Sequence, residues 1–246
     1  MTEEAKKGER IAKYLSRAGV CSRRDAERLI LEGRVSLNGK VLKSPAQNVV
    51  DSDKIYVDNQ RVGGKEQTRL WRYHKPKGLV TTHHDEKGRP TIFENLPDDL
   101  PRVMSVGRLD LTTEGLILLT NNGELARHLE LPATGWTRKY RVRAFGEITQ
   151  ARLDKLKDGI KIDGILYNSI TATLEKEQGD NVWIEMILTE GKNREIRKVL
   201  EYLGLKVNRL IRVSYGPFIL GKMGENEVQE IGYKAIKEAL GGKFLD

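Results

Sequence analysis

A short polar segment with two adjacent glycines, residues 63–67, separates two parts of the sequence that differ in pattern. The residues before it show helical periodicity followed by hairpin signals, and those after it alternate strand-like and helical runs. A segment of this composition has no apolar anchors and is typical of a flexible linker. The chain of 246 residues is long enough for two domains. We therefore predict a small domain over residues 8–67 and a larger one over residues 68–246.

The first part contains signals for two short helices and two hairpins. Apolar residues recur at helical spacing before Gly19, a residue suited to end a helix. Ser22 is suited to open the second helix as its N-cap. The pair Asn38-Gly39 predicts a two-residue turn between strands, and a second hairpin is expected around residues 58–60. The unit is expected to be two antiparallel helices with hairpins, and the helices display basic residues.

The second part alternates apolar runs of strand length with short helical patterns. The expected strands cover residues 70–74, 116–119, 139–145, 182–188 and 207–213. Helices are expected to start at Asn122 and Thr149, and another covers residues 193–203. Turn signals separate most strands, which favours a mixed, mainly antiparallel sheet with peripheral helices over a doubly wound parallel sheet. The predicted fold class is α+β.

Basic residues are concentrated in three segments. The chain has 43 Lys and Arg against 35 Asp and Glu, a net charge of +8. Residues 10–43 hold nine basic and three acidic residues, residues 192–212 hold seven and two, and residues 138–143 hold four and none. Such clusters on ordered segments are typical of phosphate contacts, whereas an ordinary solvated surface has scattered charges. Nucleic acid is therefore the expected partner.

Composition argues against a membrane or secreted protein. No apolar run approaches the roughly 20 residues of a membrane helix, and the first residues lack the apolar core of a signal peptide. The single cysteine, Cys21, allows no internal disulfide and suits a reducing compartment. The four histidines and Cys21 lack the spacing of a zinc site. We expect a cytoplasmic protein that needs neither metal nor cofactor.

A candidate reactive group lies between two glycines in the second part. Gly107 and Gly115 bracket a loop that joins two apolar runs, and Asp110 is inside it. A carboxylate on a loop held between strands is positioned rigidly enough to react. The alternative is a turn-forming aspartate that only accepts local N–H groups. The residues alone leave both interpretations open.

Residues 10–42 resemble the S4 RNA-binding domain. The resemblance rests on residues 11–20, 22–26 and 33–39. It implies binding to structured RNA, and two short helices can present arginine forks to phosphates in a fixed geometry. The residues expected to contact RNA are Arg10, Lys13, Arg17, Arg23, Arg24 and Arg28. A helical hairpin with a solvated basic face is the alternative.

The segment Gly107-Arg108-Leu109-Asp110-x-x-Thr113-x-Gly115-Leu116 resembles the signature of pseudouridine synthases of the RsuA/RluB/RluE/RluF family. Further matches, in order, are residues 75–78, 88–91, 120–126 and 190–198. Asn122 stands where the family usually has aspartate, and both residue types cap helices. With the S4 segment, the resemblance covers residues 8–220.

The resemblance implies an isomerase that converts a uridine in RNA to pseudouridine. Asp110 falls on the family's catalytic aspartate, Tyr140 on the tyrosine that packs against the flipped base, and Arg197 on the basic partner of the aspartate. Arg108 and Arg194 are expected to contact RNA. Whether Asp110 attacks C1′ of the ribose, attacks C6 of the base or removes a 2′ proton stays open.

The resemblance also narrows the substrate. Structured ribosomal RNA is the expected partner, and residues 132–146 look most like the large-subunit (23S) branch of the family. The small-subunit (16S) branch is the alternative, and a transfer RNA synthase or a non-catalytic S4-type ribosome-assembly factor are further rivals. The sequence does not identify the target uridine or the orientation of the two domains. A monomer is expected.

Overall fold

The computed structural model describes residues 8–242, 244 and 245. The helices are α1 (Ile11–Arg17), α2 (Arg23–Leu31), α3 (Gly123–Glu130), α4 (Gln150–Asp154), α5 (Glu195–Tyr202) and α6 (Tyr233–Leu240), with short 3-10 helices at Phe93–Asn95, Pro132–Thr134 and Lys155–Asp158. The N-terminal unit has strands β1 (Glu9–Arg10), β2 (Val35–Leu37), β3 (Lys40–Val41), β4 (Asn48–Val49), β5 (Ile55–Val57) and β6 (Gln60–Arg61). The remaining strands are β7 (Leu70–Lys75), β8 (Met104–Val106), β9 (Glu114–Thr120), β10 (Arg138–Phe145), β11 (Ile160–Ile162), β12 (Ile165–Tyr167), β13 (Thr171–Gln178), β14 (Asn181–Leu188), β15 (Lys206–Tyr215), β16 (Phe218–Ile219) and β17 (Val228–Glu230).

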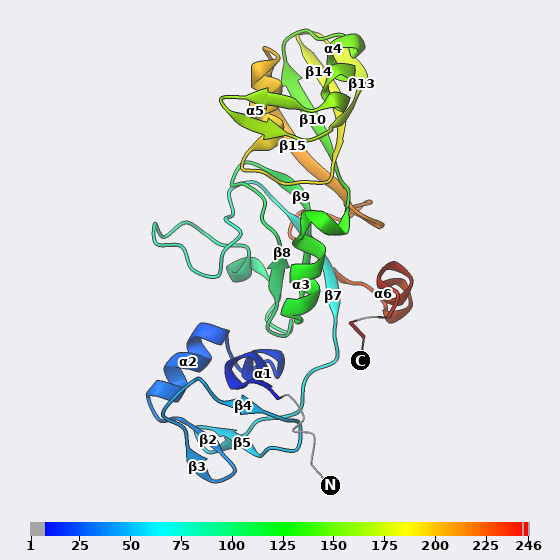
Figure 1. Ribbon diagram of the computed structural model, residues 1–246. Coiled ribbons are helices and arrows are strands. Elements are labelled where there is room, and N and C mark those ends of the chain that lie inside the picture. The colour runs from blue at the N-terminus through cyan, green and yellow to red at the C-terminus, as the bar shows by residue number, and fades with distance from the viewer. Residues whose placement is uncertain (1–7, 243, 246) are drawn as a thin grey trace.

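The N-terminal unit has the predicted two helices and two hairpins (Figure 1). The Ser22 hydroxyl accepts the Asp25 N–H at 3.0 Å and starts α2, as an N-cap does. The turn Asn38-Gly39 joins β2 to β3 with both φ angles positive, as a type I′ hairpin requires. The second hairpin also forms, with β6 starting at residue 60.

The linker is held by polar contacts. The Glu66 N–H donates to the Arg17 carbonyl at 3.2 Å, and the Asn121 side chain donates to the Glu66 carboxylate at 3.2 Å. An ion pair between Lys13 of α1 and Glu124 of α3 bridges the same two parts of the chain. The composition of residues 63–67 predicted a segment without apolar contacts, and the contacts formed are polar. Hydrophobic patterning does not reveal polar contacts of this kind. The N-terminal unit is therefore docked beside α3 (Figure 1).

The larger part is built on one mixed sheet. Its strand order is β13-β14-β10-β15-β9-β7-β17, with β16 paired to β15 and β8 to β9. Among the described strands, β9 and β15 pair in parallel and the other pairs are antiparallel. This confirms the predicted α+β fold with a mixed, mainly antiparallel sheet.

Gly115 permits the two halves of the sheet to join. Its φ is +107°, and an added Cβ would lie 2.4 Å from the backbone oxygen of Arg212 on β15. A side chain there would push β9 and β15 apart, so only glycine is compatible with this pairing. Gly115 lies five residues after Asp110. Its pairing with β15 therefore fixes the end of the loop that carries the Asp110 carboxylate.

Strand β9 is buried on both faces. Leu116 and Leu118 pack into a cluster with α3 and α6, whereas Ile117 and Leu119 pack into the main core under β10, β14 and β15. Alternation between two cores follows from the two-residue period of a strand. The expected strand over residues 116–119 was too short because the polar residues at both ends of β9 are also buried.

Candidate active site

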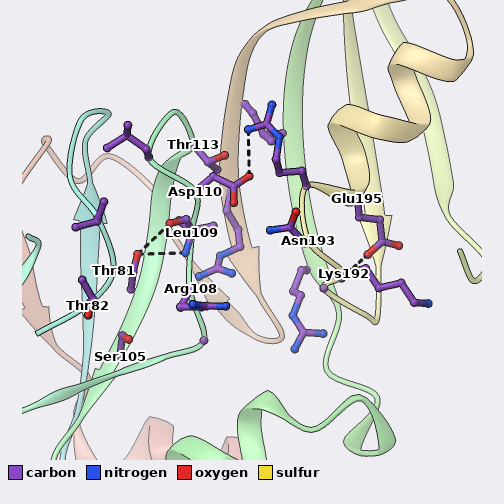
Figure 2. Close-up of a pocket in the computed structure, with 18 of the residues that line it drawn as sticks. Thr81, Thr82, Ser105, Arg108, Leu109, Asp110, Thr113, Lys192, Asn193 and Glu195 are labelled. Atoms are coloured by element: carbon purple, nitrogen blue, oxygen red, sulfur yellow. Dashed lines mark hydrogen bonds and ion pairs between the residues drawn. The ribbon is translucent and has the colours of Figure 1, made fainter. Parts of the chain in front are cut away.

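A cleft with a volume of about 960 Å³ opens where β9 and β15 meet. Segments distant in sequence form its walls: residues 80–89, the loop between β8 and β9, strands β10 and β15, and the turn before α5. It brings together Asp110, Tyr140, Arg194 and Arg212. A volume of this order is typical of a small-molecule or nucleotide site. Figure 2 shows the side chains that line it.

The loop that carries Asp110 is tethered on several sides. Thr81 Oγ1 donates to the Leu109 carbonyl at 3.0 Å and accepts the Leu109 N–H at 3.3 Å (Figure 2). The Gly107 N–H donates to Glu130 at 2.7 Å, and the Leu111 carbonyl accepts the Gly78 N–H at 2.9 Å. These contacts fix the position of the loop, and with it the position of the Asp110 carboxylate.

A buried lysine completes the support of this loop. Lys75 Nζ donates to the carbonyls of Pro76 at 3.0 Å, Asp110 at 3.2 Å and Thr113 at 2.8 Å, and the residue is 0% exposed. Burial lowers the pKa of Lys75 to about 8, although the nearby charges of Asp110 and Glu114 oppose this. Lys75 belongs to a segment that resembles the family, residues 75–78, but the resemblance implies no role for it. The position of this lysine at the end of an apolar strand was the sequence signal that could have indicated its burial.

Asp110 faces a different arginine from the one predicted. Arg194 Nη1 lies 4.0 Å from Asp110 Oδ2, and the Asp110 side chain is 33% exposed. Arg197, the predicted partner, instead donates to the Thr112 carbonyl at 3.0 Å and weakly to Val207. The direct pair with Arg197 is therefore not formed in this structure. Arg194 has a left-handed φ of 52° just before α5, and motif matching does not reveal where such a turn directs a side chain.

Arg197 nevertheless lies close to Asp110. Its pKa is lowered, first by burial and then by Arg194, while the charge of Asp110 opposes both. The Arg197 contact with Thr112 adds another tether to the Asp110 loop. Both arginines of the motif thus reach this loop from the start of α5.

Tyr140 is on the wall of the cleft, on β10. Its side chain is buried, and its register partner on β15 is Arg212. This location suits the predicted packing against a base, but a strand tyrosine of the core would be buried in the same way. The role of Tyr140 remains a prediction.

Arg212 was not singled out by the sequence. It is 2% exposed, its Nε donates to the Leu116 carbonyl at 2.7 Å, and its Nη2 has no hydrogen-bond partner within residues 8–242, 244 and 245. Its guanidinium lies over the Tyr215 ring, 5.1 Å from the centroid. A buried cation at the cleft wall makes this region favourable for anionic or carbonyl groups.

Three cations of the basic cluster of residues 138–143 already have partners within the protein. Arg138 is 6% exposed and donates to carbonyls and to the Tyr215 hydroxyl. Lys139 pairs with Glu185, and Arg141 pairs with Glu175 and lies over Trp183. The expectation that these residues contact phosphates stays a prediction, and Arg138 lines the cleft. Charge counting cannot show that acids from neighbouring strands neutralise a basic run.

The predicted RNA-binding residues differ in solvent exposure and in ion pairing. Arg23 and Arg24 are exposed and make no ion pair among the described residues, and Arg10 is exposed too. Arg28 pairs with Asp25 at 3.0 Å, and Lys13 pairs with Glu9 and Glu124. Arg17 is half-buried. Arg108 is exposed and lines the cleft, next to Asp110.

No helix in the described part is long and apolar enough to cross a membrane. Within residues 8–242, 244 and 245, no three His, Cys, Asp or Glu side chains are grouped in a way that would hold a metal ion.

Comparison with known proteins identifies the family. A profile described as RNA pseudouridylate synthase matches residues 69–202, and an S4 domain profile matches residues 9–55. The chain is 49% identical over 230 residues to an uncharacterized RNA pseudouridine synthase of Rickettsia felis, covering 94% of this chain and 100% of that protein. It is 41% identical over 221 residues to the Yersinia pestis protein named ribosomal large subunit pseudouridine synthase B, covering 87% and 70%.

A solved structure supports the fold. The crystal structure of a pseudouridylate synthase superposes with a TM-score of 0.66 at 24% identity, covering 94% of this chain and all of that one. The family profile covers more than half of the chain, and the relatives match nearly its whole length. The chain therefore belongs to the RNA pseudouridine synthases, a family of isomerases, and carries an S4 RNA-binding domain before its pseudouridine synthase domain.

Proposed function

We propose that this enzyme isomerises a specific uridine of ribosomal RNA, in the large subunit, with Asp110 as its catalytic carboxylate. The observation that carries the assignment of Asp110 is its setting: a partly exposed carboxylate, 4.0 Å from Arg194, on a loop tethered inside the cleft. The substrate assignment is supported by the relatives named as large-subunit synthases. The small-subunit RNA is the alternative.

The reaction conserves every atom of the nucleotide except one exchanged hydrogen. The bond between N1 of uracil and C1′ of ribose breaks, the base rotates, and a bond between C5 and C1′ forms. C5 loses its proton to solvent and N1 gains one. Asp110 can act as nucleophile or as base, and either role requires the ionised carboxylate. The Arg194 guanidinium lies 4.0 Å from the carboxylate, within ion-pair distance.

The target base must leave its stack to reach Asp110, because its reacting atoms are inaccessible inside a helix. Tyr140 is proposed to pack against the flipped uracil, with Arg108 and Arg194 contacting the RNA backbone. Arg197 is proposed to approach the Asp110 carboxylate when RNA binds, since it already reaches the next residues of the loop.

Substitution of Tyr140 tests the stacking role. Tyr140→Phe should keep the aromatic face and most of the activity, whereas Tyr140→Ala should lose roughly 1–3 kcal/mol of base stacking. Single-turnover pseudouridine formation would be measured for both variants, together with their thermal midpoints. If both variants react like the wild type, Tyr140 is a core residue only.

We further propose that residues 8–67 form the RNA-anchoring domain and residues 68–246 the domain that carries the reaction. Arg23 and Arg24 are the exposed cations best placed to test this, because no acid of the described chain pairs with them. The double variant Arg23→Gln/Arg24→Gln should reduce the slope of log affinity against log salt concentration by about 1.5.

The matched control removes two exposed charges elsewhere. Lys234→Gln/Lys237→Gln on α6 makes the same change of net charge on a helix away from the cleft (Figure 1). Equal salt slopes for the two double variants would mean that overall charge, not the S4 surface, drives RNA binding. Affinity would be measured by fluorescence anisotropy on a ribosomal RNA hairpin over a range of salt concentrations.

The proposed function is tested by tritium release. Ribosomal RNA transcribed with C5-tritiated uridine releases tritium to water when pseudouridine forms. Release from the large-subunit transcript, with none from the small-subunit transcript, is the expected result. Release from the small-subunit transcript alone would reverse the substrate assignment, and no release from either would contradict the proposed function.

A further inference from the structure

Two buried glutamates, Glu190 and Glu195, support the turn that carries Arg194. They are 6% and 3% exposed. The Asn168 backbone N–H and side chain donate to the two Glu190 oxygens at 2.8 and 2.9 Å, and Lys192 Nζ donates to the same carboxylate. Burial of two carboxyl groups is costly unless hydrogen bonds and charges compensate it. The proposed reaction assigns a role to neither of them.

Glu195, the first residue of α5, forms two hydrogen bonds with the backbone of Lys192 at the other end of the turn. Its Oε2 accepts the Lys192 N–H at 2.9 Å (Figure 2), and its own N–H donates to the Lys192 carbonyl at 3.1 Å. Arg194 lies between these two residues, in a left-handed conformation that residues other than glycine rarely adopt. Such a conformation persists only where neighbouring contacts hold it. The Glu195 carboxyl group supplies one of these contacts.

The second oxygen of Glu195 indicates where a proton lies. Oε1 is fully buried and has no hydrogen-bond donor among the described residues, yet the side chain contacts the Glu190 carboxyl group. Two ionised carboxylates would face each other as acceptors with like charge. Lys192 can neutralise only one of them. A proton on Glu195, donated to Glu190, would satisfy Oε1 and remove the repulsion.

We propose that a protonated Glu195, donating to Glu190, holds the turn that places Arg194 beside Asp110, so that Glu195 is a positioning residue for the isomerisation. The inference rests on the proposed function, because it takes Asp110 as the reacting group. Few contacts separate Glu195 from Asp110 in space. Glu195 accepts the Lys192 N–H, and Arg194, two residues after Lys192, places its Nη1 4.0 Å from Asp110. Loss of the proton drives the carboxylates apart and releases the turn.

The titration of Glu195 gives the direction of the pH effect. The pKa of Glu195 is raised to about 7, first by burial and also by the neighbouring Glu190, while the Lys192 N–H opposes the shift. Hydrogen bonds from Lys192 and Asn168 keep the pKa of Glu190 below its usual value, although burial opposes them. Because the pKa of Glu195 is raised on folding, the contact is complete at low pH and is lost as pH rises through about 7.

Other charged groups lie around α5, but none of them takes the place of the Glu190–Glu195 pair. The remaining charged residues on α5 and on β11 and β15, which pack against it, are Lys161, Arg194, Arg197, Lys198, Glu201, Lys206, Arg209 and Arg212. Arg209 pairs with Glu114, and Arg212 donates to the Leu116 carbonyl. The charged groups that act on Glu195 are Glu190 and Lys192.

The test compares pH profiles of three proteins. Glu195→Gln mimics the protonated carboxyl group, because its amide can donate to Glu190 while its carbonyl accepts the Lys192 N–H. Glu201→Gln makes the same charge change at an exposed position of α5. Single-turnover pseudouridine formation would be measured from about pH 5.5 to 8.5, with circular dichroism confirming the fold at each end.

The wild type and Glu201→Gln should lose activity by about tenfold as pH rises through neutrality, and Glu195→Gln should show little loss. A Glu195→Gln profile that falls like that of the wild type would overturn the inference. So would a folded Glu195→Gln protein that is inactive at every pH, since the ionised form would then be needed. If Glu195→Gln does not fold, a flat or rising wild-type profile alone overturns it. Absence of turnover in the wild type at any pH would instead mean that the proposed function has failed.

Discussion

Asp110→Asn is expected to abolish pseudouridine formation while leaving the protein folded and able to bind RNA. Asparagine has nearly the same shape, so the tethers of the loop remain, because they involve backbone groups of residues 107–113. The substitution removes the negative charge and the nucleophilic or basic oxygen. Loss of a reacting group of this kind lowers turnover by more than about a thousandfold.

The competing interpretation, a turn-forming aspartate, predicts a mild effect. Asp163, in the turn between β11 and β12, is a matched control because it is exposed and has a left-handed φ of 48° that asparagine also adopts. Asp163→Asn should change stability by less than about 1 kcal/mol and leave turnover intact. Thermal midpoint, RNA affinity and single-turnover rate would be measured for both variants. Similar rates for the two would remove Asp110 from the reaction.

Lys75→Met is expected to have the second largest effect. Methionine fills a similar volume but removes a donor from three carbonyl groups, two of them in the loop that carries Asp110. The Asp110 carbonyl keeps the Thr113 N–H at 3.0 Å. Buried acceptors that lose a partner cost about 1–3 kcal/mol each, partly offset because a buried charge is also removed. We expect the free energy of unfolding to fall by about 3 kcal/mol and turnover to fall by about a hundredfold, since a displaced catalytic group loses its alignment.

The lysine two residues later provides the control. Lys77 lies in the turn that follows β7, and its side chain is 46% exposed and lies 3.8 Å from Glu114. Lys77→Met should change the free energy of unfolding by less than about 1 kcal/mol. Urea denaturation would give both values. Equal stabilities for Lys75→Met and the wild type would show that the three hydrogen bonds do not support the loop.

The pH dependence of the Lys75 effect has a definite sign. Burial lowers the pKa of Lys75 to about 8 in the folded protein, below its usual value of 10.5. Between these values the unfolded chain binds more protons, so the stability of the wild type relative to Lys75→Met should increase as pH rises above about 8. A difference that stays constant or shrinks up to about pH 9.5 would contradict this assignment.

Much of the fold was predictable because local signals and tertiary structure agree. Ser22 caps α2 and Asn38-Gly39 turns the first hairpin, each through its own backbone preferences. The start of α5 was placed two residues too early because Arg194 adopts a left-handed conformation. The largely exposed strand β13 was missed because most of its residues are polar and only Ala172 and Leu174 pack against the main core.

The site was predictable only in part. The resemblance pointed to Asp110, Tyr140 and Arg197 as catalytic residues and to Arg194 as an RNA contact. Asp110, Tyr140 and Arg194 line one cleft, and Arg197 is not among its lining residues. Lys75, Thr81 and Arg212 gained their roles only from tertiary contacts, because each acts on a loop or strand distant in sequence. The sequence also could not show that Arg194, and not Arg197, lies nearest to Asp110. The choice of arginine beside Asp110 depends on the φ angle of Arg194, and residue types do not determine that angle.

The most direct test of the whole proposal is to map pseudouridine in ribosomal RNA from cells of the source organism with and without this gene. Carbodiimide modification followed by reverse transcription locates each pseudouridine. We expect a specific large-subunit uridine to lose its modification in the deletion strain, to regain it with the wild-type gene and to stay unmodified with Asp110→Asn. Unchanged modification in the deletion strain, or restoration by Asp110→Asn, would contradict the proposal.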